Sequence, residues 1–290
     1  MTKKSFDISG KIDRYRLEII SSIKEAADAN DIPFFIVGAT ARDIILEYIY
    51  GKKIFRATND IDFGIRVNDW KMVESLFSSL LKNKKYSLDP KVGHRLFYDE
   101  VYPVDIVPFG KIVSEDGTFK WPKDNKEFTA LGFEEAYENS YLVNVKNNPD
   151  LIVNFSTPQS LALLKIISWN ECYPERSRDA SDLVFLTESY IEAGNIKRLY
   201  EDEVDLVDEE FDFSLTGARL LGRDIAAVFK KKTLDYVLNI LDKETGKRER
   251  YRLVEDMMRG HTMKDDIHFE YYLNILKELK KGIQERIRNK

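Results

Sequence analysis

The segment from residue 60 to residue 67 constrains the fold more than any other, because apolar side chains alternate strictly with polar or small ones. Successive side chains on a β-strand point to opposite faces of the sheet. One face of this segment would carry the apolar residues Ile61, Phe63, Ile65 and Val67. The other face would carry Asp60, Asp62 and Gly64. The pattern therefore predicts a strand with one buried face and one face that bears two carboxylates.

The segments around this strand predict a small mixed β-sheet with helices on one side. Helices are expected where apolar residues recur at helical spacing, at 8–29, 41–50 and 69–81. Further strands are expected in short apolar or alternating runs, at 34–37, 94–98 and 102–107. The last two are expected to form a hairpin, and two more runs, 141–145 and 151–155, predict edge strands.

The character of the chain changes at Thr157-Pro158, after which nearly every segment has a helical pattern. Threonine is a good N-cap, and proline is favoured at the first helical position. We expect a domain boundary near residue 156, with an α/β (α+β) domain at 1–156 and an α-helical domain at 157–290. A chain of 290 residues is long enough for a core in each.

Composition limits the classes of function and the compartment. The net charge of −5 argues against a protein that coats nucleic acid through bulk charge, although a local basic groove remains compatible with it. The single cysteine, Cys172, excludes an intrachain disulfide and fits a reducing compartment. The first 16 residues contain no apolar signal-peptide core, and no run approaches the roughly 20 apolar residues of a membrane span. A cytoplasmic protein is expected.

The strongest chemical signal is the pair Asp60 and Asp62. Residues two apart on a strand point the same way and have Cα atoms roughly 6.6 Å apart. Carboxylates at that separation can share hard divalent cations, and two such cations can stabilise both oxygens of an in-line phosphoryl displacement. Asp105, in the apolar run 102–107, is the candidate third carboxylate. These three residues are predicted to be both catalytic residues and metal ligands.

Similar acidic pairs elsewhere are interpreted differently. Glu203 with Asp205, and Glu210 with Asp212, fall in the stretch 201–212, which holds eight acidic residues in twelve. We interpret this stretch as a solvated acidic surface rather than a docking site.

A phosphate-binding candidate precedes Asp60. Gly38-Ala39-Thr40 ends a buried strand and opens a helix, where exposed backbone N–H groups favour a phosphate. Glycine lets the backbone approach a ligand closely. The alternative for Gly38 is an ordinary strand-to-helix turn.

Segments 37–46 and 58–63 together resemble the signature of the polymerase-β-like nucleotidyltransferase superfamily: an apolar residue and a glycine turn, then a strand with Asp-x-Asp. The form Gly-x-x-x-Arg-Asp, which includes Arg42, is reminiscent of CCA-adding enzymes, and Asp-Ile-Asp-Phe of AbiEii-type toxins. The resemblance implies that Gly38, Ala39, Thr40 and Arg42 lie at the triphosphate. It also implies that Asp60, Asp62 and Asp105 hold two Mg²⁺ ions, for which Mn²⁺ could substitute.

The resemblance extends to about residue 186. Segment 160–167 resembles the lysine-containing helix of the AbiEii-type group, and 176–183 resembles its Asp-x-x-Asp-Leu element. It implies triphosphate contacts for Lys165 and Arg178; the alternative for Lys165 is a solvent-facing side chain.

Two features depart from the family pattern. Ala39 replaces the usual glycine or serine, so that a hydroxyl contact is lost. The interval from Gly38 to Asp60 is long and carries Lys52, Lys53 and Arg56, which form either a basic lip for substrate or a solvated charged turn.

Other features are interpreted as structural. The three histidines, His94, His261 and His268, lack metal-ligand spacing. For His94 we favour a structural role over substrate contact. The basic run 243–252 is interpreted as a surface turn, and 218–225 as helix packing.

The function predicted from these features is metal-dependent transfer of a nucleotidyl group from a nucleoside triphosphate to an acceptor hydroxyl. The site would lie in the cleft between the two domains. The acceptor would be an RNA 3′ end, such as that of tRNA, or a protein. The AbiEii-type resemblance adds a toxin role with an antitoxin partner. The alternatives are a metal-dependent glycosyltransferase with Asp-x-Asp and a degenerate nucleotide-binding or partner module.

Overall fold

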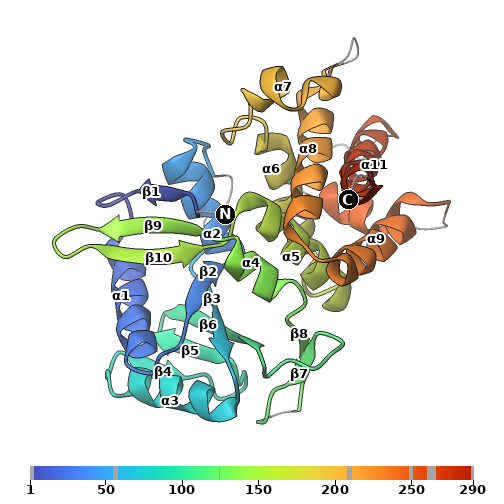
Figure 1. Cartoon of the computed structure of the whole chain (residues 1–290). Coiled ribbons are helices and arrows are strands. Elements are labelled where there is room, and N and C mark those ends of the chain that lie inside the picture. The colour runs from blue at the N-terminus through green and yellow to red at the C-terminus, as the bar shows by residue number, and fades with distance from the viewer. Residues whose placement is uncertain are drawn as a thin grey trace. The chain divides into compact units, whose positions relative to one another are not determined.

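The computed structural model describes residues 3–54, 58–123, 125–207, 211–247, 251–259 and 266–288. The chain divides into two compact units, Met1–Thr157 and Pro158–Lys290 (Figure 1). The first unit contains a mixed sheet with helices, and the second is helical. The predicted α/β (α+β) class with a C-terminal helical region is confirmed. The assignment of catalysis to the first unit stays a prediction.

The sheet of the first unit is larger than expected, with eight strands in the order β1-β9-β10-β2-β3-β6-β5-β4. In chain order its strands are β1 (Ser5–Asp7), β2 (Phe34–Val37), β3 (Ile61–Val67), β4 (Tyr86–Leu88), β5 (Arg95–Tyr98), β6 (Tyr102–Gly110), β9 (Tyr141–Lys146) and β10 (Leu151–Phe155). A separate hairpin consists of β7 (Thr118–Lys120) and β8 (Glu127–Thr129). Strands β5 and β6 are antiparallel neighbours, so the predicted hairpin is confirmed.

Strand β3 lies in the middle of the sheet, and its alternating pattern gives it two different faces. Its apolar residues Ile61, Phe63 and Ile65 are at most 1% exposed. On the other face, Gly64 leaves room for the ring of Phe35, which would collide with a Cβ there, and the ring of Phe133 would be in tight contact with that Cβ. Strand β3 is antiparallel to β2 and parallel to β6, so both of its hydrogen-bonding edges are paired within the sheet.

The helices of the first unit lie on both faces of the sheet, which corrects the expectation that they lie on one side. They are α1 (Arg14–Asp28), α2 (Gly38–Ile44), α3 (Trp70–Leu81) and α4 (Phe133–Glu138), and a π-helical segment, η1 (Ile45–Ile49), continues α2. The buried stripes of α1 and α3 pack against one another. Helix α4 lies on the face that includes Gly64, where Phe133 meets Phe35 and Phe109.

Several boundaries differ from the sequence-based ones for identifiable reasons. Helix α1 begins at Arg14 rather than near residue 8. The Asp13 carboxylate accepts a hydrogen bond from the Arg16 backbone N–H and so caps the N-terminus of the helix. Helix α2 begins directly at Gly38, without a turn. Strands β9 and β10 are not edge strands, because β1 pairs with β9 and β10 pairs with β2.

The second unit is helical from its first residue, and α5 begins at Pro158 as expected. Its helices are α5 (Pro158–Glu171), α6 (Arg178–Ser189), α7 (Arg198–Glu201), α8 (Phe213–Val228), α9 (Lys231–Thr245), α10 (Arg252–Met257) and α11 (Asp266–Arg288), with a 3₁₀ turn, η2 (Val204–Leu206). Helices α8 and α11 approach closely at Gly222 and Gly282, where an added Cβ would overlap the facing backbone. Segment 218–225, which includes Gly222, was predicted to serve in helix packing, and this contact agrees with that prediction. Within the described helices, none is both long and apolar enough to cross a membrane.

The interpretation of the acidic stretch 201–212 as a solvated surface is wrong for Glu203. This residue is 2% exposed and accepts from three arginines, Arg198, Arg223 and Arg286, at 3.2, 2.6 and 2.8 Å. A buried carboxylate is tolerated where cationic partners satisfy it. Asp205, on the same turn, is 60% exposed at its side chain and also pairs with Arg223. The predicted surface position of Glu210 lies outside the described residues.

Candidate active site

The strands β3 and β6 bring two of the predicted acidic residues together. In their parallel register, Asp62 stands directly beside Asp105. Paired residues on neighbouring strands project to the same face of a sheet, and the strands are about 4.8 Å apart. Asp60 comes immediately before β3, two residues from Asp62. The three aspartates therefore gather at one end of two adjacent central strands.

The Asp105 carboxylate already forms an ion pair with the side chain of Arg95. The Arg95 guanidinium on β5 donates to both carboxylate oxygens, from Nε to Oδ1 at 2.6 Å and from Nη2 to Oδ2 at 2.7 Å. Asp105 is 7% exposed and the Arg95 side chain is 30% exposed, so the carboxylate is shielded from water more than the guanidinium is. The hydrogen bonds to Asp105 raise the pKa of Arg95, and the charges of Asp89 and Asp60 add to the effect. Within the described residues, no group of three acidic, histidine or cysteine residues has the spacing of a ready-made metal site.

Two threonines fix the position of Asp60. The Thr40 hydroxyl is fully buried and donates to the backbone carbonyl of Asp60 at 2.6 Å. The Thr58 hydroxyl donates to the Asp60 carboxylate. Sequence analysis placed Thr40 at the triphosphate, whereas here its hydroxyl is directed to Asp60; its contact with nucleotide stays a prediction.

Gly38 is required by its close approach to Asp62. Its φ of 72° lies in the left-handed region, which favours glycine. A Cβ at this position would overlap a carboxylate oxygen of Asp62 and lie 2.7 Å from its Cγ. The glycine therefore allows the Asp62 carboxylate to rest against the first residue of α2. Ala39, the next residue, is 8% exposed.

Arg42 is enclosed rather than presented to solvent. Arg42 is 0% exposed, and its Nε donates a hydrogen bond to Asp43 Oδ1 at 2.8 Å. A direct contact between Arg42 and a triphosphate would require the side chain to become accessible. The predicted nucleotide-binding role of Arg42 stays a prediction.

In the second unit, the solvent-facing alternative for Lys165 is wrong. Its amine lies 2.6 Å from Asp179 and 2.7 Å from Asp182, and the residue is 6% exposed. Burial alone would lower the pKa of Lys165, but the two carboxylates outweigh it and raise the pKa, so the amine stays charged. Arg178 is exposed at the start of α6. Triphosphate contacts of Lys165 and Arg178 stay predictions.

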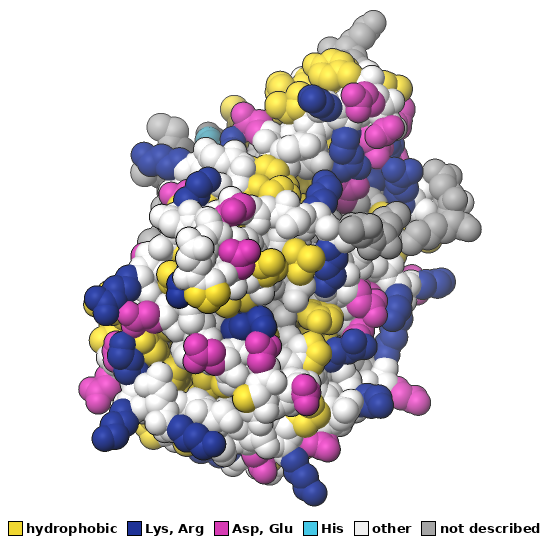
Figure 2. Space-filling model, turned by 60° about the vertical axis from the view of Figure 1, so that its left-hand side comes forward, with side chains coloured by type: hydrophobic (Ala, Val, Ile, Leu, Met, Phe, Trp, Pro, Cys, Tyr) yellow, Lys and Arg dark blue, Asp and Glu magenta, His cyan; other side chains and the backbone are white. Residues whose placement is uncertain are grey.

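The basic interval before Asp60 is described only in part. Lys52 is half-buried and Lys53 is exposed, whereas Arg56 lies outside the described residues. On the molecular face in Figure 2, the described Lys and Arg side chains are interspersed with Asp and Glu. This mixture agrees with the expectation that bulk charge does not attract nucleic acid to the protein.

The structural interpretation of His94 is supported by its surroundings. Its ring meets Trp121 and Phe128 edge-on, with centroid distances of 6.0 and 5.0 Å. Of the other histidines, His268 lies in the first turns of α11 and His261 lies outside the described residues.

Sequence analysis missed Arg95 as a member of the site. The signal was present in the hairpin, because β5 and β6 are joined by the three residues 99–101. If Tyr98 is paired with Tyr102 and residues are counted away from the turn along both strands, Arg95 comes opposite Asp105. The register in the structure agrees.

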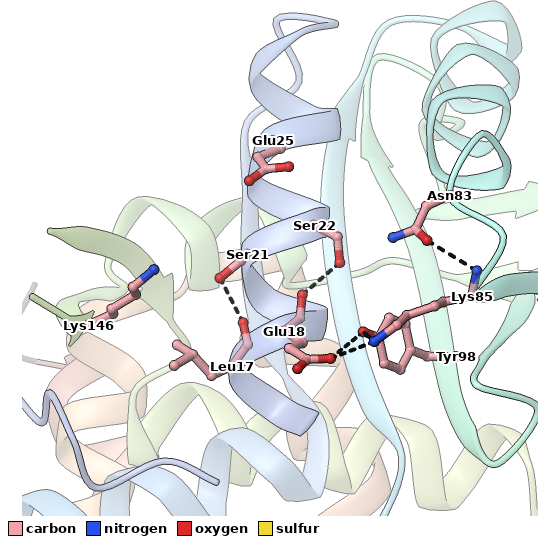
Figure 3. Close-up of a pocket in the computed structure, with 9 residues that line it drawn as sticks. All are labelled: Leu17, Glu18, Ser21, Ser22, Glu25, Asn83, Lys85, Tyr98 and Lys146. Atoms are coloured by element: carbon pink, nitrogen blue, oxygen red, sulfur yellow. Dashed lines mark hydrogen bonds and ion pairs between the residues drawn. The ribbon is translucent and has the colours of Figure 1, made fainter. Parts of the chain in front are cut away.

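A polar groove of about 420 Å³ lies elsewhere in the first unit, beside α1 (Figure 3). At its centre the Glu18 carboxylate accepts from Tyr98 at 2.6 Å and from Lys85 at 2.9 Å. The hydrogen bond from Tyr98, followed by those from Lys85 and Arg14, lowers the pKa of Glu18 to about 2. The three predicted acidic residues do not line this groove. Its lining residues are Leu17, Glu18, Ser21, Ser22, Glu25, Asn83, Lys85, Tyr98 and Lys146.

Comparison with known proteins gives partial structural likeness only. No family model and no curated protein matches the sequence. Among solved structures, the antibiotic-resistance factor ANT(2'')-Ia is 15% identical, with 67% of this chain and 97% of that chain covered and a TM-score of 0.35. A STING-associated CdnE c-di-GMP synthase from Capnocytophaga granulosa is 10% identical, with 94% and 81% covered and a TM-score of 0.26. A Thermotoga maritima CCA-adding enzyme complexed with tRNA is 12% identical, with 95% and 71% covered and a TM-score of 0.25.

These TM-scores do not decide the family or the function. The resemblance to AbiEii-type toxins therefore stays a prediction.

Proposed function

We propose that the protein is a nucleotidyltransferase that uses divalent cations, Mg²⁺ or Mn²⁺, bound at Asp60 and Asp62. The observation that carries the proposal is the gathering of Asp60, Asp62 and Asp105 at one end of β3 and β6, with Gly38 against Asp62. Asp62 and Asp105 lie on two strands in which most of the other residues are apolar. Such a cluster suits a site where phosphate oxygens are bound through cations.

The side chains present fit divalent cations at Asp60 and Asp62. Both residues are half-buried, and carboxylate oxygens are the ligands that hard cations prefer. The backbone of Asp60 is held by Thr40, so that the ligand would be positioned before the cation arrives. When bound, the cations would neutralise the charge of the triphosphate and of the displaced pyrophosphate. Asp105 could serve as a third ligand only alongside Arg95 or after Arg95 has moved.

For the acceptor, we propose the 3′ end of an RNA such as tRNA, with a protein hydroxyl as the alternative. Lys52 and Lys53 precede the acidic cluster in sequence, in a protein whose net charge is −5. A local basic segment favours one macromolecular end over general coating of nucleic acid. The proposed toxin role, with an antitoxin partner, rests on the resemblance of the sequence alone.

A labelling experiment tests the proposal. The purified protein is incubated with Mg²⁺ and each α-labelled nucleoside triphosphate, together with total RNA or with cell protein. We expect label to enter RNA and to be lost in Asp62→Asn, whereas Asp150→Asn, an exposed aspartate near β10, serves as the matched control. Label that enters only protein would refute the RNA acceptor. Label that persists in Asp62→Asn would identify a contaminating activity, and no label with any nucleotide would refute the proposed function.

The second candidate is a nucleotide-binding module without catalysis, which the pairing of Asp105 with Arg95 favours. It predicts that a nucleoside triphosphate with Mg²⁺ raises the melting temperature, because a ligand that binds only the native state stabilises it. Transfer would be absent under the same conditions. The combination of binding without transfer distinguishes this candidate from the enzyme.

A further inference from the structure

Arg95, Asp105 and Asp62 form a single row across three adjacent strands. Arg95 on β5 pairs with Asp105 on β6, and Asp105 pairs with Asp62 on β3. Residues paired in this way project to the same face, so Asp105 has the guanidinium of Arg95 on one side and the carboxylate of Asp62 on the other. A divalent cation between the two aspartates would lie close to the positive charge of Arg95.

The contact between Arg95 and Asp105 is strong for a group that is partly accessible. Both carboxylate oxygens accept a charged N–H, at 2.6 and 2.7 Å, and bidentate pairs of this kind are among the strongest hydrogen-bonded pairs in proteins. The Asp105 side chain is 10% exposed and that of Arg95 is 30% exposed. The arginine therefore already satisfies the charge that a metal ion would otherwise neutralise.

We propose that Arg95 is a positioning residue that suppresses divalent-cation binding at Asp105 in the nucleotide-free protein. This inference rests on the proposed function, because it assigns a regulator to the same metal site. The positive charge of Arg95 opposes a second positive charge beside Asp105. A bound triphosphate supplies negative charge that offsets this opposition, so cation and nucleotide would bind together rather than the cation alone.

The expected effect can be worked out from the strand spacing. One unit charge about 5 Å from a divalent cation is unfavourable by an amount equivalent to roughly five- to tenfold in affinity, even at the dielectric constant of water with moderate salt. Arg95→Gln removes this charge and retains a polar, although shorter, side chain. It should therefore increase the affinity of the nucleotide-free protein for Mn²⁺ by about that factor.

The test is a Mn²⁺ titration of the nucleotide-free protein, followed by the electron paramagnetic resonance signal of free Mn²⁺. Arg66→Gln is the matched control, because Arg66 lies on the same strand as Asp62 and pairs with Glu134. We expect the control to bind as the wild type does. In a double-mutant cycle, Arg95→Gln should have a smaller effect in an Asp105→Asn background, because that variant lacks the ligand that would hold the cation beside Arg95.

A variant that folds poorly does not prevent the test. Arg95→Gln leaves the Asp105 carboxylate without its arginine partner. Added Mn²⁺ should therefore raise the melting temperature of this variant more than that of the wild type. Arg95→Lys keeps the positive charge and should bind Mn²⁺ like the wild type.

Several outcomes would overturn the inference. Affinity for Mn²⁺ that is unchanged or weaker in Arg95→Gln would do so, as would a gain that is equally large without Asp105 or an absence of Mn²⁺ binding in every variant. The labelling experiment is separate: tighter Mn²⁺ binding without nucleotidyl transfer would support the role of Arg95 and refute the proposed function. Transfer that needs Asp62 without any effect of Arg95→Gln on Mn²⁺ would do the reverse.

Discussion

Replacement of Lys165 by methionine should destabilise the second unit strongly. The Lys165 side chain is 7% exposed, and those of Asp179 and Asp182 are 4% and 1% exposed. Arg176 also pairs with Asp179, at 2.8 Å, but its side chain is 44% exposed. Loss of the lysine thus leaves two buried carboxylates with less neutralising charge. Breaking a buried ion pair by removing one partner costs about 3–5 kcal/mol.

The measurement is urea unfolding followed by far-UV circular dichroism, together with a thermal melt. For a unit of 133 residues, a loss of 1 kcal/mol lowers the melting temperature by about 3–5 °C, so a decrease of about 10–20 °C is expected for Lys165→Met. Lys231→Met is the control, because Lys231 is 80% exposed and pairs with Asp235 at the surface. It should cost no more than about 0.5 kcal/mol.

Two further measurements separate the charge effect from packing. The triple variant Lys165→Met/Asp179→Asn/Asp182→Asn removes all three charges and should recover much of the lost stability. Although burial opposes it, the charges of Lys165 and Arg176 lower the pKa of Asp179 in the wild type, so the stabilisation that this gives is lost as the pH falls, and the difference from Lys165→Met should narrow. A loss below about 1 kcal/mol for Lys165→Met, or a loss that is independent of pH, would refute the argument from buried charge.

Three more predictions follow from single contacts. Gly38→Ala should lower the free energy of unfolding by about 1–3 kcal/mol, because the new Cβ meets Asp62 at a positive φ; an unchanged urea midpoint would contradict this. For Glu18 the folded pKa of about 2 is below the ordinary 4.5, so its contacts stabilise the protein fully above pH 4.5 and are lost as the pH falls toward 2. The difference in melting temperature between wild type and Glu18→Gln should therefore shrink over that range, and a constant difference would be inconsistent with this. Glu203→Ala should cost about 3–5 kcal/mol in scanning calorimetry, because Arg223 and its neighbours lose a buried partner; a cost near zero would indicate that Glu203 is hydrated.

Features determined by local pattern could be predicted from the sequence. The alternation of 61–67 reproduces β3, and the apolar run at 34–37 reproduces β2, because burial on the sheet selects apolar side chains at those positions. The start of α5 at Pro158 also follows from local preference. The pairing of Asp62 with Asp105 does not follow from these local patterns, because it depends on the parallel register of β3 with β6.

Features that depend on distant partners could not be predicted. Strand β1 has only three residues and is defined by its pairing with β9, more than 130 residues later. Glu203 lies in an acidic stretch, and only the arrangement of Arg198, Arg223 and Arg286 around it makes burial favourable. Lys165 belongs to the same class, since the helix pattern contains no sign of the two carboxylates brought by α6.

The position of β2 in the sheet has a consequence for biosynthesis. This strand is buried along its whole length, and one of its two neighbours, β10, is among the last segments of the first unit to emerge from the ribosome. Until Phe155 pairs with Ile36, the Phe34–Val37 strand has an open hydrogen-bonding edge. An exposed apolar edge is a site for pairing with other chains. A nascent chain stalled before residue 155 should therefore depend on chaperones. Folding of this unit should be completed only after its last strand has been synthesised.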